Sequence, residues 1–351
     1  MNQNLKKISV CIPAYNRPEL LTPLLDSILS QKHTNYEIVI CEDASPMREQ
    51  IRNIVDEYKI KWPGLFHYYE NEKNLGYDGN IRNLILKSSG DYCFFMGNDD
   101  LMHPKALESV ASAIARHENI GAVLRTYASF DDSPENINQV FRYFENETFF
   151  PAGPDTITTF YRRSVVISGL VLHREEALKY STDIFDGTLL YQLYLVANIL
   201  INMNGVFSPE ILALYRNGGI PDFGNSEKEK GKFVPNIQTP ESSIHFMRGM
   251  LDIVKWTEEN RNVEIVKRIV TDIGNYCYPI LSIQAKQPLK VFIKYAYQFA
   301  KLGFWKNKMF YLYFLSLIVL SVDRADNIIQ FIKCRIGYTP VIGKVYRGEV
   351  K

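Results

Sequence analysis

Asp99 and Asp100 stand next to each other at the end of an apolar run, and this pair is the clearest sign of chemistry in the chain. The run from residue 91 reads Asp-Tyr-Cys-Phe-Phe-Met-Gly-Asn-Asp-Asp. Such a strand is typical of a parallel sheet covered on both faces, whose ligands bind beyond the carboxyl ends of the strands. Two carboxylates there suit Mg²⁺ or Mn²⁺ held against a diphosphate. The alternative is an Asx turn before the helix that Pro104 announces.

The elements that must position this pair alternate between strands and helices through the first 130 residues. Apolar runs predict strands at 8–13, 36–41, 65–69 and 121–129, besides the run that begins at Asp91. Helical spacing of apolar residues predicts helices at 19–29, 51–58, 80–88 and 107–116. This alternation predicts an α/β fold with a parallel, doubly wound sheet.

The second half of the chain follows a different pattern. It predicts a strand at 165–172, a short helix at 174–179, an apolar helix from Thr188 and extended structure at 205–215. Residues 216–240, dense in glycine, proline and charge, predict a long loop. From Ser242 to about Arg335 the pattern is helical.

Composition indicates an ordinary globular protein, since 46% of the 351 residues are hydrophobic. The five cysteines have neither zinc spacing nor the look of a disulfide framework, and no secretory signal precedes the first strand. Both observations predict a cytoplasmic location. Charge is uneven: residues 241–351 hold 17 Lys and Arg against 9 Asp and Glu, whereas the first 240 residues hold 23 against 30. The basic C-terminal region is therefore expected to face something anionic.

Residues 309–322 carry no charge and follow Lys301, Lys306 and Lys308. Fourteen residues are too few to span a bilayer, which takes about 20. Two interpretations stay open at this point. The segment is either a buried core helix or an interfacial helix lying on an anionic membrane surface.

Other predicted strand ends add polar groups to the same edge of the sheet. After the first strand, Pro13 and Ala14 stiffen the chain, Tyr15 offers a ring to a base, and Arg17 offers charge to a phosphate. After the second strand, Asp43 is suited to accept a hydrogen bond from a base edge. Taken alone, Tyr15 is equally a rim aromatic and Asp43 a helix cap.

A glycine-containing turn at 74–79 leads into a helix whose first turns carry Arg82. Alone, Arg82 is equally a surface ion-pair residue. The ordered set, however, resembles the nucleotide-sugar half of family 2 glycosyltransferases with the GT-A fold. The resemblance covers the first 130 residues firmly and residues 160–216 loosely. It rests on Ile12-Pro13-Ala14-Tyr15-Asn16-Arg17, Glu42-Asp43-Ala44-Ser45, Asn74-Leu75-Gly76, Arg82-Asn83, Ser89-Gly90-Asp91-Tyr92 and Gly97-Asn98-Asp99-Asp100 followed by Pro104.

The resemblance implies an inverting transfer of a sugar from a nucleoside diphosphate to an acceptor hydroxyl, assisted by Mg²⁺ or Mn²⁺. Together with the helical pattern and basic charge after residue 240, it predicts a division into a GT-A domain over residues 1–240 and a helical basic region over 241–351. Within the domain, 1–130 is the nucleotide-binding half and 131–240 the acceptor half. The contacts implied by position are Pro13, Tyr15 and Asp43 with the base, Arg82 with the base or pyrophosphate, Arg216 with the pyrophosphate, and Asp99 and Asp100 with the ribose and metal.

Two departures from the family pattern affect the chemistry. Gly97 stands where the family usually has an aspartate, so metal binding rests on Asp100 or draws a neutral oxygen from Asn98. The usual Glu-Asp pair that supplies the general base is also missing. Asp186 is closest in position, with Asp183 as the second choice, and the alternative for Asp186 is a helix cap.

Competing functions would require other residues at the same places. A nucleotidyltransferase would place a glycine-rich basic loop after the first strand, and a dinucleotide-dependent oxidoreductase would need Gly-x-Gly-x-x-Gly there. A degenerate sugar-binding or nucleotide-binding module stays open because of Gly97. A basic tail resting on a membrane would favour a polyprenyl-linked oligosaccharide acceptor for a surface polysaccharide, in an enzyme similar to abequosyltransferases. Nucleic acid has no binding motif to support it as a partner.

Overall fold

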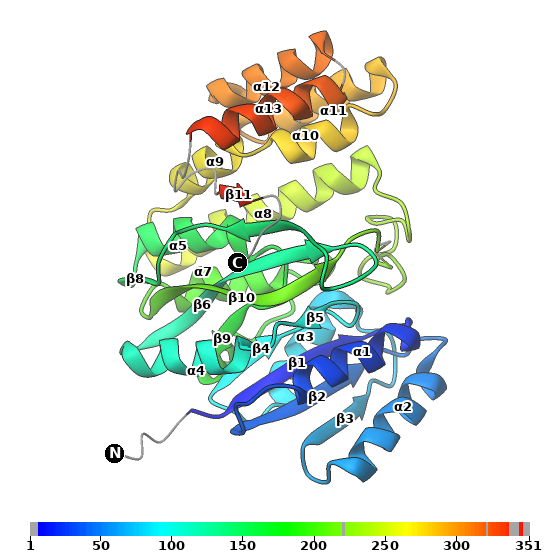
Figure 1. Ribbon diagram of the computed structural model, residues 1–351. Coiled ribbons are helices and arrows are strands. Elements are labelled where there is room, and N and C mark those ends of the chain that lie inside the picture. Colours follow the sequence, from blue (N-terminus) through cyan, green and yellow to red (C-terminus); the bar gives the residue numbers. More distant parts are fainter. Residues whose placement is uncertain (1–5, 220–221, 321, 337–343, 347–351) are drawn as a thin grey trace.

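Eleven strands of the described chain form one sheet (Figure 1). The computed structural model describes residues 6–219, 222–320, 322–336 and 344–346. The strands are β1 (Ile8–Ala14), β2 (Tyr36–Glu42), β3 (Phe66–Glu70), β4 (Tyr92–Phe95), β5 (Leu101–Met102), β6 (Ile120–Phe130), β7 (Ile137–Arg142), β8 (Thr148–Phe150), β9 (Val171–His173), β10 (Asn204–Arg216) and β11 (Lys344–Tyr346).

Helices pack on both faces of this sheet, and the later helices form a further layer beyond one end of it. Those within the first 200 residues are α1 (Pro18–Leu29), α2 (Arg48–Lys61), α3 (Gly76–Lys87), α4 (Ala106–Arg116), α5 (Pro154–Tyr161), the 3₁₀ turn η1 (Arg162–Ser164), α6 (Arg174–Lys179) and α7 (Tyr191–Ile199). The later ones are α8 (Pro240–Arg261), α9 (Val266–Asn275), α10 (Tyr278–Gln284), α11 (Leu289–Lys301), the 3₁₀ turn η2 (Phe304–Lys306), α12 (Lys308–Val319) and α13 (Val322–Ile336).

The sheet is mixed, with a parallel portion built from the first half of the chain. Its main path runs β11-β7-β6-β9-β4-β1-β2-β3, and β10 pairs with β5, β6 and β8. Strand β1 is parallel to both β2 and β4, and β2 is parallel to β3. Strand β9 is antiparallel to its neighbours β4 and β6. The carboxyl ends of β1, β2 and β4 therefore meet at one edge, as the sequence predicts.

Alternate residues of the parallel strands enter two separate hydrophobic cores. In β1, Cys11 joins the core with α3 and α7, whereas Val10 and Ile12 join the core with α1, α2 and α4. In β4, Phe95 and Phe94 divide in the same way. Because both faces are buried, the strands can be apolar at every position, which explains the runs seen in the sequence.

The predicted strand at 165–172 is largely absent, and this corrects the sequence-based expectation. Only β9 is extended there, since Gly169 adopts φ 81° and the Leu170 amide donates to the Ile167 carbonyl at 2.9 Å. That turn breaks the strand. Residues 165–168 consequently leave the sheet and become part of a cavity wall.

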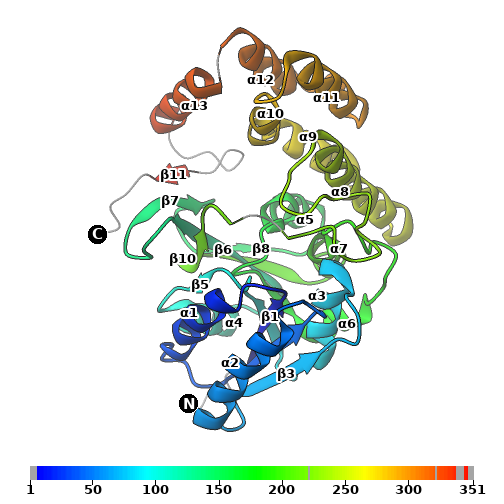
Figure 2. The same ribbon diagram turned by 90° about the vertical axis from the view of Figure 1, so that its right-hand side faces the viewer.

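The helices from α8 onward extend away from the sheet, at the opposite end of the molecule from α2 and β3 (Figures 1 and 2). Helix α8 packs on α7, and its Met247, Met250 and Leu251 belong to the core that α3 and α7 also share. Helix α8, the first helix after residue 240, therefore continues the core of the preceding segment. The division of the chain at residue 240 stays a prediction. Within the described ranges, no helix is both long enough and apolar enough to cross a membrane.

Candidate active site

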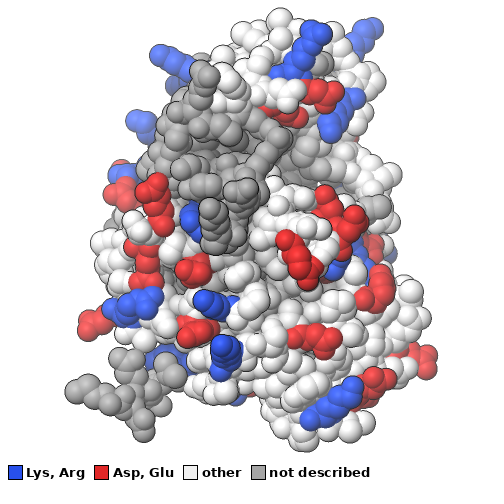
Figure 3. Space-filling model, in the orientation of Figure 1, with Lys and Arg blue, Asp and Glu red and all other residues white. Residues whose placement is uncertain are grey.

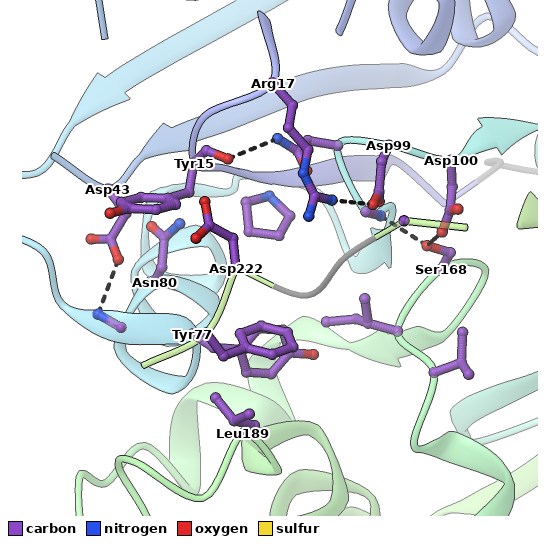
Figure 4. Close-up of a pocket in the computed structure, with 18 of the residues that line it drawn as sticks. Tyr15, Arg17, Asp43, Tyr77, Asn80, Asp99, Asp100, Ser168, Leu189 and Asp222 are labelled. Carbon is purple, nitrogen blue, oxygen red and sulfur yellow. Dashed lines mark hydrogen bonds and ion pairs between the residues drawn. The ribbon is translucent and has the colours of Figure 1, made fainter. Parts of the chain in front are cut away.

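A cavity of about 340 Å³ opens beyond the carboxyl ends of β1, β2 and β4 (Figure 4). Its volume lies within the range of small-molecule sites, roughly 300–1,000 Å³. Polar side chains, most of them from the turns after the strand ends, form one wall, and mostly apolar side chains face them. The polar wall includes Tyr15, Arg17, Asp43, Asn80, Asn98, Asp99, Asp100 and Asp222, and the apolar wall includes Tyr77, Val165, Val166, Ile167, Leu189, Phe223 and Phe246.

The turn after β1 presents Tyr15 and Arg17 to the cavity. Asn16 and Arg17 both adopt left-handed backbone angles, with φ 54° and 55°, before Pro18 opens α1. The Asn98 side-chain amide donates to the carbonyls of Tyr15 and Asn16 at 3.3 and 3.2 Å. Asn98 therefore ties the turn after β4 to the turn after β1. The left-handed backbone angles of the turn after β1 are strained and need such support.

Asp43 faces the cavity at the end of β2 and is held by three donors. Its carboxylate accepts from the amides of Leu75 and Gly76 at 2.8 and 3.0 Å, and from the Asn71 side chain at 2.7 Å. Burial raises the pKa of this carboxyl to about 6, against the effect of these hydrogen bonds. The neighbouring Glu42 serves the turn itself, since it accepts from the Ser45 amide at 2.6 Å.

The N-terminus of α3 closes one end of the cavity. Gly76 adopts φ 76°, and a Cβ there would lie 2.5 Å from Ser226 Oγ and 2.8 Å from Glu229 Oε1. The buried Glu229 carboxylate accepts from the amides of Tyr77 and Gly224 at 2.8 and 2.9 Å. Glycine is thus required where the loop after β10 docks on the helix. Residues 220 and 221 of that loop lie outside the described residues.

Asp99 and Asp100 lie at the other end of the cavity. Asp99 forms an ion pair with Arg17. Asp100 accepts from Ser168 Oγ at 2.5 Å and from the Arg216 amide at 3.0 Å. Burial, followed by the adjacent Asp99 charge, raises the pKa of Asp100 to about 7. A cation would relieve that repulsion and favour the ionised carboxylates.

The donor set fits a hard divalent cation. A Cβ on Gly97 would lie 3.1 Å from Asp99 Oδ1, and 3.2 Å from both Asp100 Oδ2 and Ser168 Oγ, so three oxygens converge beside this glycine. Within the described ranges, no cluster of three or more His, Cys, Asp or Glu side chains could hold a metal. Two carboxylates suffice for Mg²⁺ or Mn²⁺ when substrate phosphates supply further ligands.

The apolar wall brings together five separate segments of the chain. Residues 165–168 come from the irregular stretch before β9, Leu189 from the turn before α7, and Phe246 from α8. Tyr77 of α3 packs edge to face against Phe223, with ring centroids 5.6 Å apart. An apolar surface opposite charged groups suits a ligand that has one phosphate-bearing and one less polar side.

Asp78 holds the turn that carries Leu189. Its buried carboxylate accepts from the amides of Gly187, Thr188, Leu189 and Tyr191 at distances of 2.8 to 3.0 Å. Leu189 itself adopts φ 65°, an unusual angle for a leucine. Burial raises the pKa of Asp78 to about 6. Helix α3 therefore positions the apolar wall as well as the polar one.

Several residues predicted from the sequence lie apart from this cavity. Arg82 and Asp186 contact each other, with N···O distances of 2.7 and 2.9 Å, and Arg82 also donates to the Thr182 carbonyl at 2.8 Å. Asp183 is exposed. Among the described residues, the cavity lining does not include Ala14, Arg82, Asp183, Asp186 or Arg216, although Arg216 holds Asp100 through its amide and the Asp99 carbonyl through Nε.

Sequence reasoning missed several lining residues. Ser168 carried no local signal, because a serine in an apolar run is usually part of a strand. Tyr77 lies inside the glycine-containing turn at 74–79 and Asn80 directly after it, and their helical spacing could have indicated a shared face. Leu189, Phe246 and Glu229 reach the site only through tertiary packing.

Comparison with known proteins supplies the family. The profile described as glycosyl transferase family 2 matches residues 9–178, which contain every residue named above for the polar wall except Asp222. This part of the chain belongs to glycosyl transferase family 2. The domain thus includes Tyr15, Asp43 and both Asp99 and Asp100.

Two curated relatives share this domain. The poly(ribitol-phosphate) beta-N-acetylglucosaminyltransferase TarP of Staphylococcus aureus is 38% identical over 109 residues, which is 30% of this chain and 32% of the relative. The abequosyltransferase RfbV of Salmonella typhimurium is 35% identical over 100 residues, 28% of this chain and 30% of the relative. The chain thus spans about a third of the length of these relatives.

Solved structures extend the likeness to most of the chain, at the level of the fold. S. aureus TarS, in complex with UDP-GlcNAc, has a TM-score of 0.60 and 17% identity, covering 84% of this chain and 80% of that chain. A mannosyltransferase of Pyrobaculum calidifontis, in complex with GDP-Man and Mn²⁺, has a TM-score of 0.52 and 14% identity, covering 90% and 87%. The fold is that of the GT-A glycosyltransferases, as the sequence predicted.

Proposed function

We propose that this glycosyltransferase moves a sugar from a nucleoside-diphosphate sugar to an acceptor hydroxyl, with inversion at the anomeric carbon. The observation that supports the proposal is the order of side chains along the cavity. Tyr15 and Asp43 lie at one end, Asp99 and Asp100 lie at the other, and Arg17 lies between them (Figure 4). A nucleoside diphosphate has a nucleobase at one end and a diphosphate at the other. The base needs an aromatic ring and a hydrogen-bond acceptor, and the diphosphate needs a cation held by carboxylates.

In this proposal the base stacks on Tyr15 beside Pro13, and its N–H groups donate to Asp43. Arg17 supplies positive charge on the phosphate side, and Arg216 keeps both aspartates in place through its amide and Nε. Asp99 and Asp100 would hold Mg²⁺ or Mn²⁺. When bound, the ion would offset the negative charge that gathers on the leaving diphosphate.

We propose Asp186 as the general base, as predicted from the sequence, and Asp183 as the second candidate. An inverting transfer needs a carboxylate that accepts the acceptor proton on the face opposite the leaving group. The Asp186 carboxylate is held by both terminal nitrogens of Arg82. To serve as the base, it must leave Arg82 when substrates bind.

We further propose a lipid-linked oligosaccharide acceptor for a surface polysaccharide, used in the cytoplasm. Two observations support it. The apolar wall offers a surface for the less polar part of a substrate, and the buried cysteines Cys11, Cys41, Cys93 and Cys277 are free, as expected where thiols stay reduced. The side chain of Cys334 lies outside the described residues.

Calorimetric titration of UDP, CDP, GDP and dTDP, with and without Mn²⁺, tests the donor site. We expect one nucleotide to bind and Mn²⁺ to strengthen its binding. Asp99→Ala should abolish the metal effect, whereas Asp56→Ala, on the outer face of α2, should keep it. Failure of every nucleotide to bind the wild type would refute the proposal and favour a degenerate module.

A further inference from the structure

The outer face of α12 is apolar and open to solvent. Among the described residues of this helix only Phe310 and Leu317 are buried. Leu312, Leu315 and Val319 are 58%, 56% and 78% exposed, at the spacing of a single helical face. Most apolar side chains of α12 are thus not fully buried, although Tyr313 and Phe314 pack against the core. Residue 321 lies outside the described residues.

The neighbouring turn η2 belongs to the same surface. Trp305 is exposed, and the Tyr311 hydroxyl donates to its carbonyl at 2.8 Å. Ile318 is also exposed on this face. We call this surface the α12 face; its members are Trp305, Tyr311, Leu312, Leu315, Ile318 and Val319. It lies at the end of the molecule remote from α2, as Figures 1 and 2 show for α12.

Lysines accompany the α12 face, and acidic residues are missing from its part of the sequence. Residues 273–322 contain no Asp or Glu but hold Lys286, Lys290, Lys294, Lys301, Lys306 and Lys308. All six are exposed. Figure 3 shows blue side chains projecting at this end of the molecule, with red side chains among them on the face that it draws. None of the six forms an ion pair with any residue that the structure describes.

Two of these lysines lie over exposed aromatic rings. The Lys306 ammonium is 4.7 Å from the Trp305 ring centroid, and the Lys301 ammonium is 4.5 Å from that of Tyr297. Exposed Trp and Tyr beside Lys are the side chains that prefer the boundary between lipid and water. The lysine stems can cover apolar surface while their charges reach outward.

We propose that the α12 face binds an anionic lipid surface, with α12 lying along the headgroup region. Apolar side chains on one helix face insert among the acyl chains, and the surrounding lysines attract the lipid phosphates. A second copy of this chain fits less well, because pairing two α12 faces would bring the Lys306 and Lys308 charges of both copies together. The inference does not rest on the transfer reaction, since lipid binding needs neither donor nor acceptor.

Flotation of the full chain with vesicles tests the inference. We expect binding to vesicles containing phosphatidylglycerol, little binding to pure phosphatidylcholine, and release by high salt. Leu312→Ser with Leu315→Ser should weaken binding at least tenfold. The matched control is Ile60→Ser with Leu86→Ser, which removes two apolar side chains of even greater exposure from α2 and α3. This control should bind as the wild type does.

Lysine variants separate charge from apolar insertion. Replacing Lys301, Lys306 and Lys308 by Gln should weaken binding on the order of a hundredfold at low salt, roughly fivefold for each lysine. The same change at Lys59, Lys61 and Lys73 is the control. Failure of the wild type to bind anionic vesicles would overturn the inference, as would full binding by the leucine variant. Sedimentation that shows a dimer lost in the leucine variant, without vesicle binding, would assign the face to a second copy.

Discussion

The Arg82 guanidinium forms two parallel hydrogen bonds with the Asp186 carboxylate, with N···O distances of 2.7 and 2.9 Å. These residues lie 104 positions apart in the sequence. Arg82 comes from α3, whose first turn also lines the donor end of the cavity. Asp186 precedes the turn that Asp78 holds and that presents Leu189. The pair therefore joins the nucleotide-binding half to the segment expected to meet the acceptor.

We expect this pair to be energetically coupled. Arg82→Gln and Asp186→Asn should each lower the free energy of unfolding by about 2 kcal/mol, the typical cost of losing a hydrogen bond to a charged group. The double variant should lose little more than either single variant. Urea unfolding of the four proteins gives the coupling energy. Losses that add within about 0.5 kcal/mol would show that the two residues act independently.

The general-base prediction can be separated from this structural role. Because Asp186 does not line the cavity, Asp186→Asn should leave nucleotide affinity within about twofold of the wild type while lowering kcat by at least about a hundredfold. Arg82→Gln, which keeps the carboxylate, is the control. Rate measurements across pH decide the role. If Asp186 is the base, the acidic limb of the pH–rate profile should disappear in Asp186→Asn and persist in Arg82→Gln. Equal losses of kcat in both variants, with an unchanged pH–rate profile, would leave Asp186 a positioning residue.

Gly76 offers a test of how the loop after β10 docks at the donor end. Gly76→Ala introduces strain at φ 76° and places a methyl group against Ser226 and Glu229. Gly64 has φ 82° but open space around its Cβ position, so Gly64→Ala measures the strain alone. We expect the Gly76 variant to lose about 1–2 kcal/mol more, and to bind nucleotide more weakly. Thermal unfolding and titration calorimetry give the two values, and equal losses would contradict the docking contact.

Glu37 should make stability depend on acid pH. Burial alone would raise the pKa of this carboxyl, but hydrogen bonds from Lys7, Ser89 and Ser9 outweigh it and lower the pKa to about 2. A depressed folded pKa stabilises above the unfolded value, near 4.5, and the contribution is lost as pH falls towards 2.

Glu37→Gln tests this dependence. It should cost about 2–3 kcal/mol at pH 7 and progressively less below pH 4.5. Urea unfolding across this range measures the difference, and Glu72→Gln, at an exposed position, is the control. A constant difference at all pH values would refute the assignment.

The sequence by itself determined the sheet edge and most of its polar wall. Alternating apolar strands and helices specify parallel strands, and the carboxyl ends of parallel strands meet at one edge. Tyr15, Asp43 and Asp99 follow such ends directly, so local sequence was enough to bring them together. The uncharged, lysine-flanked segment at 309–322 left a core helix and an interfacial helix both open, and the sequence did not show which of its faces is exposed.

Only the tertiary structure decided the opposite wall and the partners of the charged groups. Ser168 reaches Asp100 because Gly169 breaks a run that the sequence pattern favours as a strand. Arg82 contacts Asp186 rather than the cavity, and Leu189 enters it, through contacts between segments about 100 residues apart. Pairings at such separation depend on how whole elements pack, and hydrophobic periodicity carries no record of them.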